Sequence, residues 1–370
     1  MKLDTFQAWC TAQKISTSLD IRQSPDGSRY TALVGDIPST DRIPLLQVPL
    51  PACITASSSE ALADRLLFER TVGDLSNYKP YLDLLPPDEA SFASMPRFWS
   101  ETRVASVTDG GQLKRALERD QSRLNPAVVD PWAMACVDSR SHFLPDGTYS
   151  LTPVLDMINH EPGVDTSLKI LKEDDEGSIS LSVASESMSA ASSSSSWWDA
   201  SWWGKKPEAP SGYQRQDKEV CISYGDFSNL HTLMNYGFVV PNNPHNTEEL
   251  YIRMIRATPV RITLQKDGTP TEDGLSQLRQ LVASTEEKEI LDCMPAAEKN
   301  PLLFVSPRNE DEVYGLLAAE IDLAVDQATD GARVAGEAQD ALVETYLKER
   351  ARTLQLALDR IKTNFPQVLM

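Results

Sequence analysis

Three polar residues gather within five positions at the end of a strand-like segment. Asp156, Asn159 and His160 lie in the sequence LTPVLDMINHEP, where Pro162 stops the segment. Asx and His side chains often cap backbone groups at such a junction, so a purely structural role is the simplest interpretation of this piece alone. The segment therefore marks a candidate site without assigning its chemistry.

Two tyrosines flank a turn and a short helix further along the chain. The stretch 220–240 begins as a strand that ends at Tyr224, breaks at Gly225 and Asp226, and continues as a helix that stops at Tyr236. Each ring offers an apolar body and one hydroxyl that donates or accepts a hydrogen bond. Both rings could face one pocket, although ordinary core packing is the simpler interpretation of this stretch when it is taken alone.

Several other chemistries find no support in the sequence. The four histidines show no H-x-x-x-H pairing and the five cysteines no C-x-x-C pair, so neither a metal site nor a disulfide framework is expected. A G-x-S-x-G elbow, a P-loop and a G-x-G-x-x-G loop are also absent. The net charge of −19 argues against nucleic acid as the main partner, because phosphate binding needs a basic face.

Compartment and membrane association follow from composition. The scattered cysteines indicate a reducing environment, and no apolar run approaches the roughly 20 residues that span a bilayer. The first fifteen residues lack the apolar core of a signal peptide and do not resemble a transit peptide. We therefore expect an intracellular protein, cytoplasmic by default, with nucleus and chloroplast left open and the oligomeric state undetermined.

The segments around these residues alternate between strand-like and helical spacing of their apolar residues, which predicts an α+β fold. Strand-like runs occur at 30–37, 45–48, 52–55, 149–155 and 179–183. A helical pattern, including helices near 112–124 and 128–143, interrupts them over roughly 57–145. Beyond residue 249 the pattern is mostly helical, with a capping box at Ser284 to Glu287, and predicts a separate α-helical domain over 251–370.

A serine-rich segment breaks the composition over roughly 185–216. Serine runs with proline and glycine cannot build a core, so a surface loop is expected. The segment also carries Trp197, Trp198, Trp202 and Trp203. Because Trp198 and Trp202 are one helical turn apart, a short amphipathic anchor for a partner or a membrane surface is a second interpretation.

Together, the two motifs resemble those of the SET-domain protein methyltransferases. The paired patterns are D-x-x-N-H at 156–160 and I-S-Y-G-x-x-S-N followed by Y-G-F-V at 222–239. They look most like the branch typified by the Rubisco large-subunit lysine methyltransferase, which has a helical insertion inside the SET β-fold and a helical C-terminal substrate-binding domain. The similarity extends to YLDLLP at 81–86 and covers most of the first 250 residues.

The resemblance implies a SET domain over 1–250 and the helical domain over 251–370. It implies a protein-lysine N-methyltransferase that uses S-adenosylmethionine and acts on a non-histone protein. By position, Asn159 and His160 would hold the cofactor, and Tyr224 would be the catalytic tyrosine at the methyl-transfer channel.

The resemblance also assigns residues on the substrate side. Tyr236 would help to wall the target-lysine pocket, and Arg140 and Asp156 match positions that contact the substrate side. Methyl transfer from a sulfonium to an amine is an in-line displacement, so alignment is the main task of the enzyme. The lysine, with an ordinary pKa of about 10.4, must attack as a neutral amine, and a dry aromatic pocket favours loss of its proton. No metal is required.

Two alternatives stay open. Family members carry a glycine-rich turn ahead of the first strands, where the backbone approaches the cofactor, whereas residues 28–33 of this chain read SRYTAL. This departure and the tryptophan-rich segment favour a catalytically impaired SET-like module that binds a partner protein. Among enzymes, protein-histidine methylation is the alternative, because this branch also hosts it.

Overall fold

The chain forms two compact units. A computed structural model describes residues 2–23, 29–35, 40–123, 129–173, 176–185, 219–253, 258–295 and 302–369. The first unit comprises Met1–Phe98, Asp120–Asp226 and Asn235–Gly237, and the second comprises Trp99–Arg119, Phe227–Met234 and Phe238–Met370. These units interleave along the sequence, and the division into domains at residue 250 remains a prediction. The serine-rich segment, including its four tryptophans, lies beyond Ser185 outside the described residues.

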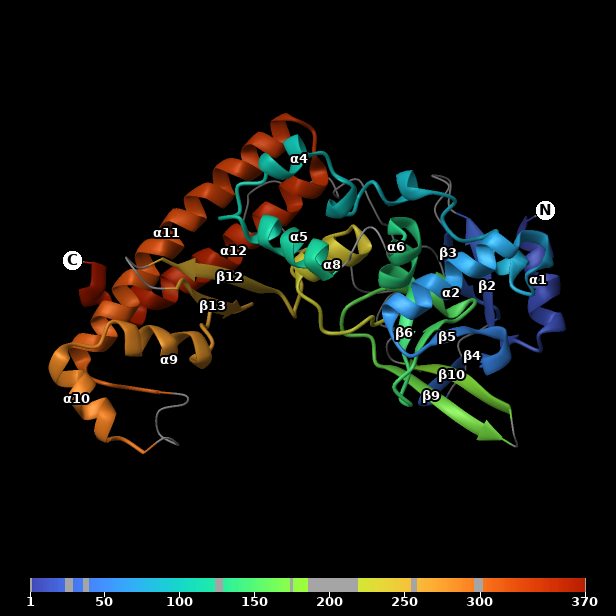
Figure 1. Cartoon of the computed structure of the whole chain (residues 1–370), viewed down its shortest axis with the longest axis horizontal. Helices are drawn as coiled ribbons and strands as arrows, with labels where there is room; N and C mark the ends of the chain where they lie inside the picture. Colours follow the sequence, from blue (N-terminus) through green and yellow to red (C-terminus); the bar gives the residue numbers. More distant parts are fainter. Residues whose placement is uncertain are drawn as a thin grey trace. The chain divides into compact units, whose positions relative to one another are not determined.

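Short antiparallel sheets dominate the first unit (Figure 1). Its strands are β1 Ser16–Thr17, β2 Leu19–Gln23, β3 Arg29–Leu33, β4 Arg42–Pro49, β5 Ile54–Ala56, β6 Ser141–Phe143, β7 Tyr149–Leu151, β8 Asn159–His160, β9 Thr166–Glu173, β10 Glu176–Ala184 and β11 Cys221–Ile222. The sheets have the orders β1-β4-β10-β9, β5-β7-β6 and β2-β3. One further pair, β8 with β11, is parallel.

Helices fill the sequence between β5 and β6. They are α2 Ser59–Val72, α3 Lys79–Leu82, α4 Glu101–Ala105, α5 Gln112–Arg123 and α6 Pro131–Arg140, and α1 Lys2–Ala12 precedes the first strand. The helices expected near 112–124 and 128–143 are thus confirmed as α5 and α6. Helix α6 begins where the Asp130 side chain accepts a hydrogen bond from the Ala133 amide, and it ends at Arg140.

The core of the first unit holds α6 in place. Its residues from Trp132 to Val137 are all buried, so the helix is enclosed on every side rather than along one stripe. The rings of Phe6 and Trp9 from α1 stack 5.7 Å apart, and Phe6 also lies 6.4 Å from the ring of Tyr81. Because α6 is fixed by this packing, the position of its last residue, Arg140, is fixed too.

The second unit is mostly helical but contains a hairpin that the sequence analysis did not predict. Its elements include β12 Thr247–Ile252, β13 Val260–Gln265, α9 Glu272–Leu281, α10 Thr285–Cys293, α11 Pro307–Glu337 and α12 Ala341–Asn364. Alternate residues of both strands are buried, and Leu250 and Ile262 share one core cluster with Leu317 and Leu354. The capping box between Ser284 and Glu287 is confirmed at the start of α10.

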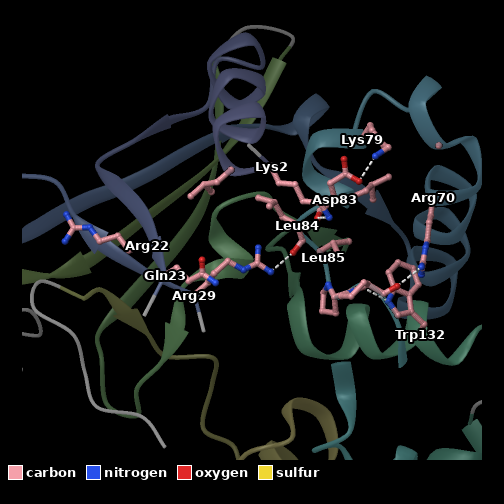
Figure 2. A pocket seen from close by; sticks show the side chains of 15 residues that line it. Lys2, Arg22, Gln23, Arg29, Arg70, Lys79, Asp83, Leu84, Leu85 and Trp132 are labelled. Carbon is pink, nitrogen blue, oxygen red and sulfur yellow. Dashed lines mark hydrogen bonds and ion pairs between the residues drawn. The ribbon is translucent and has the colours of Figure 1, made fainter. Parts of the chain in front are cut away.

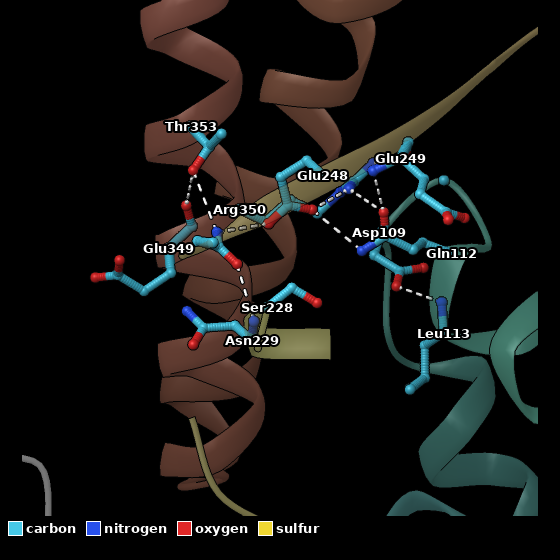
Figure 3. A network of polar contacts seen from close by, with 12 residues as sticks. Asp109, Gln112, Leu113, Ser228, Asn229, Glu248, Glu249, Glu349, Arg350 and Thr353 are labelled. Carbon is cyan, nitrogen blue, oxygen red and sulfur yellow. Dashed lines mark hydrogen bonds and ion pairs between the residues drawn. The ribbon is translucent and has the colours of Figure 1, made fainter. Parts of the chain in front are cut away.

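A buried polar network lies inside the second unit (Figure 3). Arg350 of α12 donates to Oε2 of Glu248 at 2.5 Å and to Oε1 of Gln112 at 3.0 Å. The Gln112 amide donates to Oε2 of Glu248 at 3.1 Å, and the Asn246 amide donates to Oε1 at 3.1 Å. Both Glu248 oxygens therefore have partners, and the network joins α5, β12 and α12 inside the core.

Two findings on the described residues concern membranes and metals. In the described parts of the chain, none of the helices has the length and apolar character that crossing a bilayer requires. The same residues contain no group of three or more His, Cys, Asp and Glu side chains placed to hold a metal ion.

Candidate active site

Strand pairing brings the two sequence motifs together. In the parallel pair of β8 and β11, Asn159 lies opposite Cys221 and His160 opposite Ile222. The Tyr224 amide then donates to Nδ1 of His160 at 3.0 Å, across 64 positions of sequence. Because Nδ1 accepts this bond, the ring proton of a neutral His160 sits on Nε2. Asn159, His160 and Tyr224 therefore lie next to one another.

Three aromatic rings follow one another at this surface. The His160 and Tyr224 ring centroids are 4.9 Å apart, and those of Tyr224 and Tyr236 are 5.1 Å apart. Tyr236 is the last residue of α8 Asn229–Tyr236. Gly237 follows it with φ +75°, and a Cβ there would meet Oγ of Ser94 at 2.1 Å, so only glycine lets the chain turn at this point.

The two phenols are held in their neutral form. Burial raises the pKa of Tyr224, and burial together with the charge of Asp138 raises the pKa of Tyr236 to about 12. The Tyr224 hydroxyl donates to the backbone carbonyl of Ile158 at 2.7 Å. Its single proton is used by that bond, so the Tyr224 oxygen faces any further partner as an acceptor.

The partly buried Arg140 pairs with the buried Asp156, and both charges act on Tyr224. Oδ2 of Asp156 accepts from the Tyr81 hydroxyl at 2.9 Å and from Nη1 of Arg140 at 3.4 Å, and the same Nη1 donates to the Asp156 carbonyl at 3.0 Å. Burial raises the pKa of Asp156, and the Arg140 charge opposes that shift. Among the residues that the structure describes, Oδ1 of Asp156 and Nε of Arg140 are buried without a hydrogen-bond partner.

The strained backbone of Val154 sets the position of Asp156. Val154 has φ 71° and is 2% exposed, although β-branched residues strongly avoid the left-handed region. Such backbone strain costs on the order of 1–3 kcal/mol and persists only where the surrounding structure enforces it. Val154 precedes the 3-10 turn η5 Leu155–Met157, which carries the Asp156 side chain into the interior.

A cation-rich cavity of about 640 Å³ also belongs to the first unit (Figure 2). Its charged lining residues are Lys2, Arg22, Arg29, Arg70, Lys79 and Asp83. Arg29 donates to the Leu84 carbonyl at 2.7 Å. Burial and the neighbouring Arg140 charge lower the pKa of Arg29, whereas Asp156 opposes the shift. This cavity is therefore electrostatically coupled to the Arg140–Asp156 pair, and it is locally basic in a chain whose net charge is −19.

All six residues singled out from the sequence lie in the first unit. Contacts join Asn159, His160, Tyr224 and Tyr236 into one group. Arg140 and Asp156 form a second group, whose charges act on Tyr224. Three further residues were not predicted. Tyr81 donates to Asp156, Arg29 lines the cavity, and Glu219 accepts from the Asn159 amide at 2.9 Å. The sequence offered two signals: Tyr81 opens the YLDLLP stretch, and Glu219 is an acidic residue directly before the apolar strand VCI.

Comparison with known proteins identifies the architecture. No family model matches the chain. Mouse SET domain-containing protein 4 is 26% identical over 218 residues, which cover 50% of this chain and 42% of that protein. The chain thus matches less than half the length of this curated relative.

Two solved structures superimpose on nearly the whole chain. The SET domain of LSMT bound to lysine and AdoHcy matches with a TM-score of 0.72 and 16% identity, covering 99% of this chain and 92% of that one. Rubisco LSMT bound to AdoMet matches with a TM-score of 0.66 and 17% identity, covering 100% and 93%. The predicted α+β fold is confirmed, and this chain has the fold of these LSMT SET-domain structures, with a helical C-terminal region.

Proposed function

We propose that this chain is an S-adenosylmethionine-dependent protein-lysine N-methyltransferase acting on a non-histone protein. The observation that carries the proposal is the row of His160, Tyr224 and Tyr236 rings, joined to Asn159 by the β8–β11 ladder. Similarity to LSMT structures containing AdoMet, AdoHcy or sinefungin, and lysine or monomethyllysine, supports this choice of cofactor and substrate.

The buried polar atoms of the site fit the proposed cofactor. S-adenosylmethionine ends in an ammonium and a carboxylate, and the unpaired Oδ1 of Asp156 and Nε of Arg140 complement these two charges. In the family resemblance, Asn159 and His160 are the cofactor residues, while Arg140 and Asp156 match substrate-side positions. Their unpaired atoms support a role for this pair at the amino-acid end of the cofactor as well. When bound, the cofactor supplies the methyl group on its sulfonium.

The residues of the chain contribute alignment rather than acid–base chemistry. The Tyr224 oxygen can only accept, because its proton is bound to the Ile158 carbonyl. A neutral lysine amine would donate one N–H to that oxygen, and this would leave its lone pair directed along the pocket. The packed rings of Tyr224 and Tyr236 exclude water, which favours the neutral amine over the ammonium.

Two measurements test the proposal. Titration calorimetry with S-adenosylhomocysteine should give a saturable binding curve, and absence of heat at millimolar ligand would favour the partner-binding module instead. Transfer of a labelled methyl group into a cell extract, followed by mass spectrometry, should locate the label on lysine of a non-histone protein. A label on histidine would favour the histidine methyltransferase alternative.

The tyrosine assignment has its own test. We expect Tyr224→Phe to lower kcat about 100-fold, because the variant loses the acceptor that aligns the amine. Affinity for S-adenosylhomocysteine should stay within about twofold, since the phenol proton binds the protein and not the ligand. Tyr149→Phe is the matched control, because the Tyr149 ring packs edge-on against Phe143. Full activity of Tyr224→Phe would remove Tyr224 from the channel.

A further inference from the structure

The cavity of Figure 2 is lined by five cations and one carboxylate, in a chain whose net charge is −19. Its volume of about 640 Å³ lies within the range of roughly 300–1,000 Å³ that is usual for small-molecule pockets. Its apolar lining includes the buried side chains of Leu84, Leu85 and Trp132. None of the six residues placed in the candidate active site lines this cavity. The cavity is therefore a separate candidate binding site.

Two arginines lie at opposite ends of one backbone segment of the cavity wall, 84–87 (Figure 2). Nη2 of Arg29 donates to the backbone carbonyl of residue 84 at 2.7 Å, and Nη2 of Arg70 donates to that of residue 87 at 2.7 Å. Between them, Nε1 of Trp132 donates to the carbonyl of residue 86 at 2.8 Å. Three residues of extended chain span at most about 10 Å, so the two carbonyls that anchor the guanidiniums lie within that distance of each other.

Neither arginine is neutralised by a carboxylate. Within the described parts of the chain, Arg29 and Arg70 form no ion pair. By contrast, Arg22 and Lys79, which also line the cavity, each pair with an aspartate. A guanidinium has five N–H donors, and each of the two arginines uses one of them in the hydrogen bonds above. Both side chains are exposed, so their remaining donors are open to a ligand.

We propose that this cavity binds an elongated organic dianion, with one anionic group at Arg29, the other at Arg70 and an apolar middle along segment 84–87. A guanidinium binds a carboxylate or a phosphate through two parallel hydrogen bonds. The segment reads Leu-Leu-Pro-Pro, and its prolines have no N–H, so it offers mainly apolar surface between the two arginines. An anion at Arg29 would also oppose the effect of burial and of the Arg140 charge, which lower the pKa of this group.

Carboxylates of different length and charge test the proposal on the full chain. Suberate, whose apolar chain is long enough to bring one carboxylate to each arginine, should give a saturable curve in titration calorimetry. Octanoate has the same chain with one carboxylate, and succinate is too short to reach both arginines. Each should bind about tenfold more weakly than suberate, because each loses one charge-assisted contact. Equal affinities for suberate and octanoate, or no saturable heat with suberate at millimolar concentration, would overturn the proposal.

Substitution of either arginine should abolish the advantage of the dianion. Arg29→Gln and Arg70→Gln should each weaken suberate binding about tenfold, to the level of octanoate. Octanoate binding should change by about twofold at most, since it can use the other arginine. If Arg70→Gln loses its fold by circular dichroism, Arg29→Gln decides the outcome, because Arg29 is an exposed residue at the start of β3. Unchanged suberate affinity in the folded Arg29 variant would overturn the proposal.

Arg65→Gln is the matched control. It removes the same charge from α2, the helix that carries Arg70, but Arg65 does not line the cavity. Suberate affinity should therefore stay unchanged, and a loss as large as that of Arg70→Gln would show general electrostatic attraction and overturn the proposal. These titrations contain no cofactor. Absence of suberate binding would refute this inference alone, whereas absence of S-adenosylhomocysteine binding would refute the proposed function.

Discussion

Two arginine–carboxylate pairs with buried carboxylates, one in each compact unit, differ in how completely their carboxylate oxygens are bound. In the second unit, both oxygens of Glu248 have donors, and the side chains of Glu248 and Arg350 are each 1% exposed (Figure 3). In the first unit, Oδ2 of Asp156 accepts two bonds, yet Oδ1 has no partner among the described residues. Arg140 keeps 22% of its side chain exposed.

The unpaired oxygen distinguishes the Asp156 pair, which can bind a ligand, from the Glu248 pair, which only stabilises the fold. A buried polar atom without a partner costs on the order of 1–3 kcal/mol, so folding alone does not favour it. Both arginines leave Nε unpaired within the described chain, and the contrast therefore rests on the carboxylates. Both oxygens of Glu248 are bound and its network joins three elements, whereas Asp156, two residues after the strained Val154, retains an unpaired acceptor.

The largest expected effect is on the Glu248–Arg350 pair. Arg350→Met should lower the free energy of unfolding by about 3–5 kcal/mol, because it leaves the Glu248 carboxylate buried without its cation. Burial already raises the pKa of Glu248, so protonation would relieve part of this cost. Urea denaturation measures the change. The control is Arg333→Ala, whose ion pair with Glu337 has side chains 60% and 65% exposed and should contribute less than about 1 kcal/mol. Similar values for the two variants would contradict the comparison.

An intermediate effect is expected at the Asp156–Arg140 pair. Asp156→Asn should lower the free energy of unfolding by about 1–3 kcal/mol, less than Arg350→Met does. The effect is smaller because Arg140 keeps its bond to the backbone carbonyl of residue 156 and partial access to water. The substitution should also weaken S-adenosylhomocysteine binding about tenfold, which corresponds to roughly 1.4 kcal/mol. Glu248→Gln, the counterpart in the second unit, should destabilise the protein and leave that affinity unchanged. Equal effects of both variants on binding would show that the pairs do not differ in function.

The smallest effect concerns pH. The pKa of Tyr236 is raised to about 12, above the value of about 10 expected in the unfolded chain, so its contribution to stability is complete below pH 10 and is lost as the pH rises toward 12. Between pH 7 and 10 both site phenols keep their protons. The single-turnover rate of methyl transfer should therefore rise steadily as the substrate lysine loses its proton. A falling limb below pH 10, in protein that is still folded, would contradict neutral phenols at the site.

The local patterns of the sequence were sufficient for several elements. Helix α6 lies within the helical pattern expected near 128–143, and the capping box of α10 follows from Ser284 and Glu287. Hairpin β12–β13 was missed, because its two short alternating segments gain their burial from α11 and α12, which lie far along the chain. Strand patterns of this length are decided by tertiary packing rather than by propensity.

By itself, the sequence determined the residue types of the site: an Asp, an Asn-His pair and two tyrosines, in an order that resembles one family. Only the tertiary structure decided which atoms of those residues have a hydrogen-bond partner. The parallel pairing of β8 with β11 brings Glu219 to Asn159, and the left-handed turn at Val154 brings Asp156 to Tyr81 and Arg140. Hydrogen-bond saturation depends on contacts between distant segments and on burial, and both quantities exist only once the chain has folded.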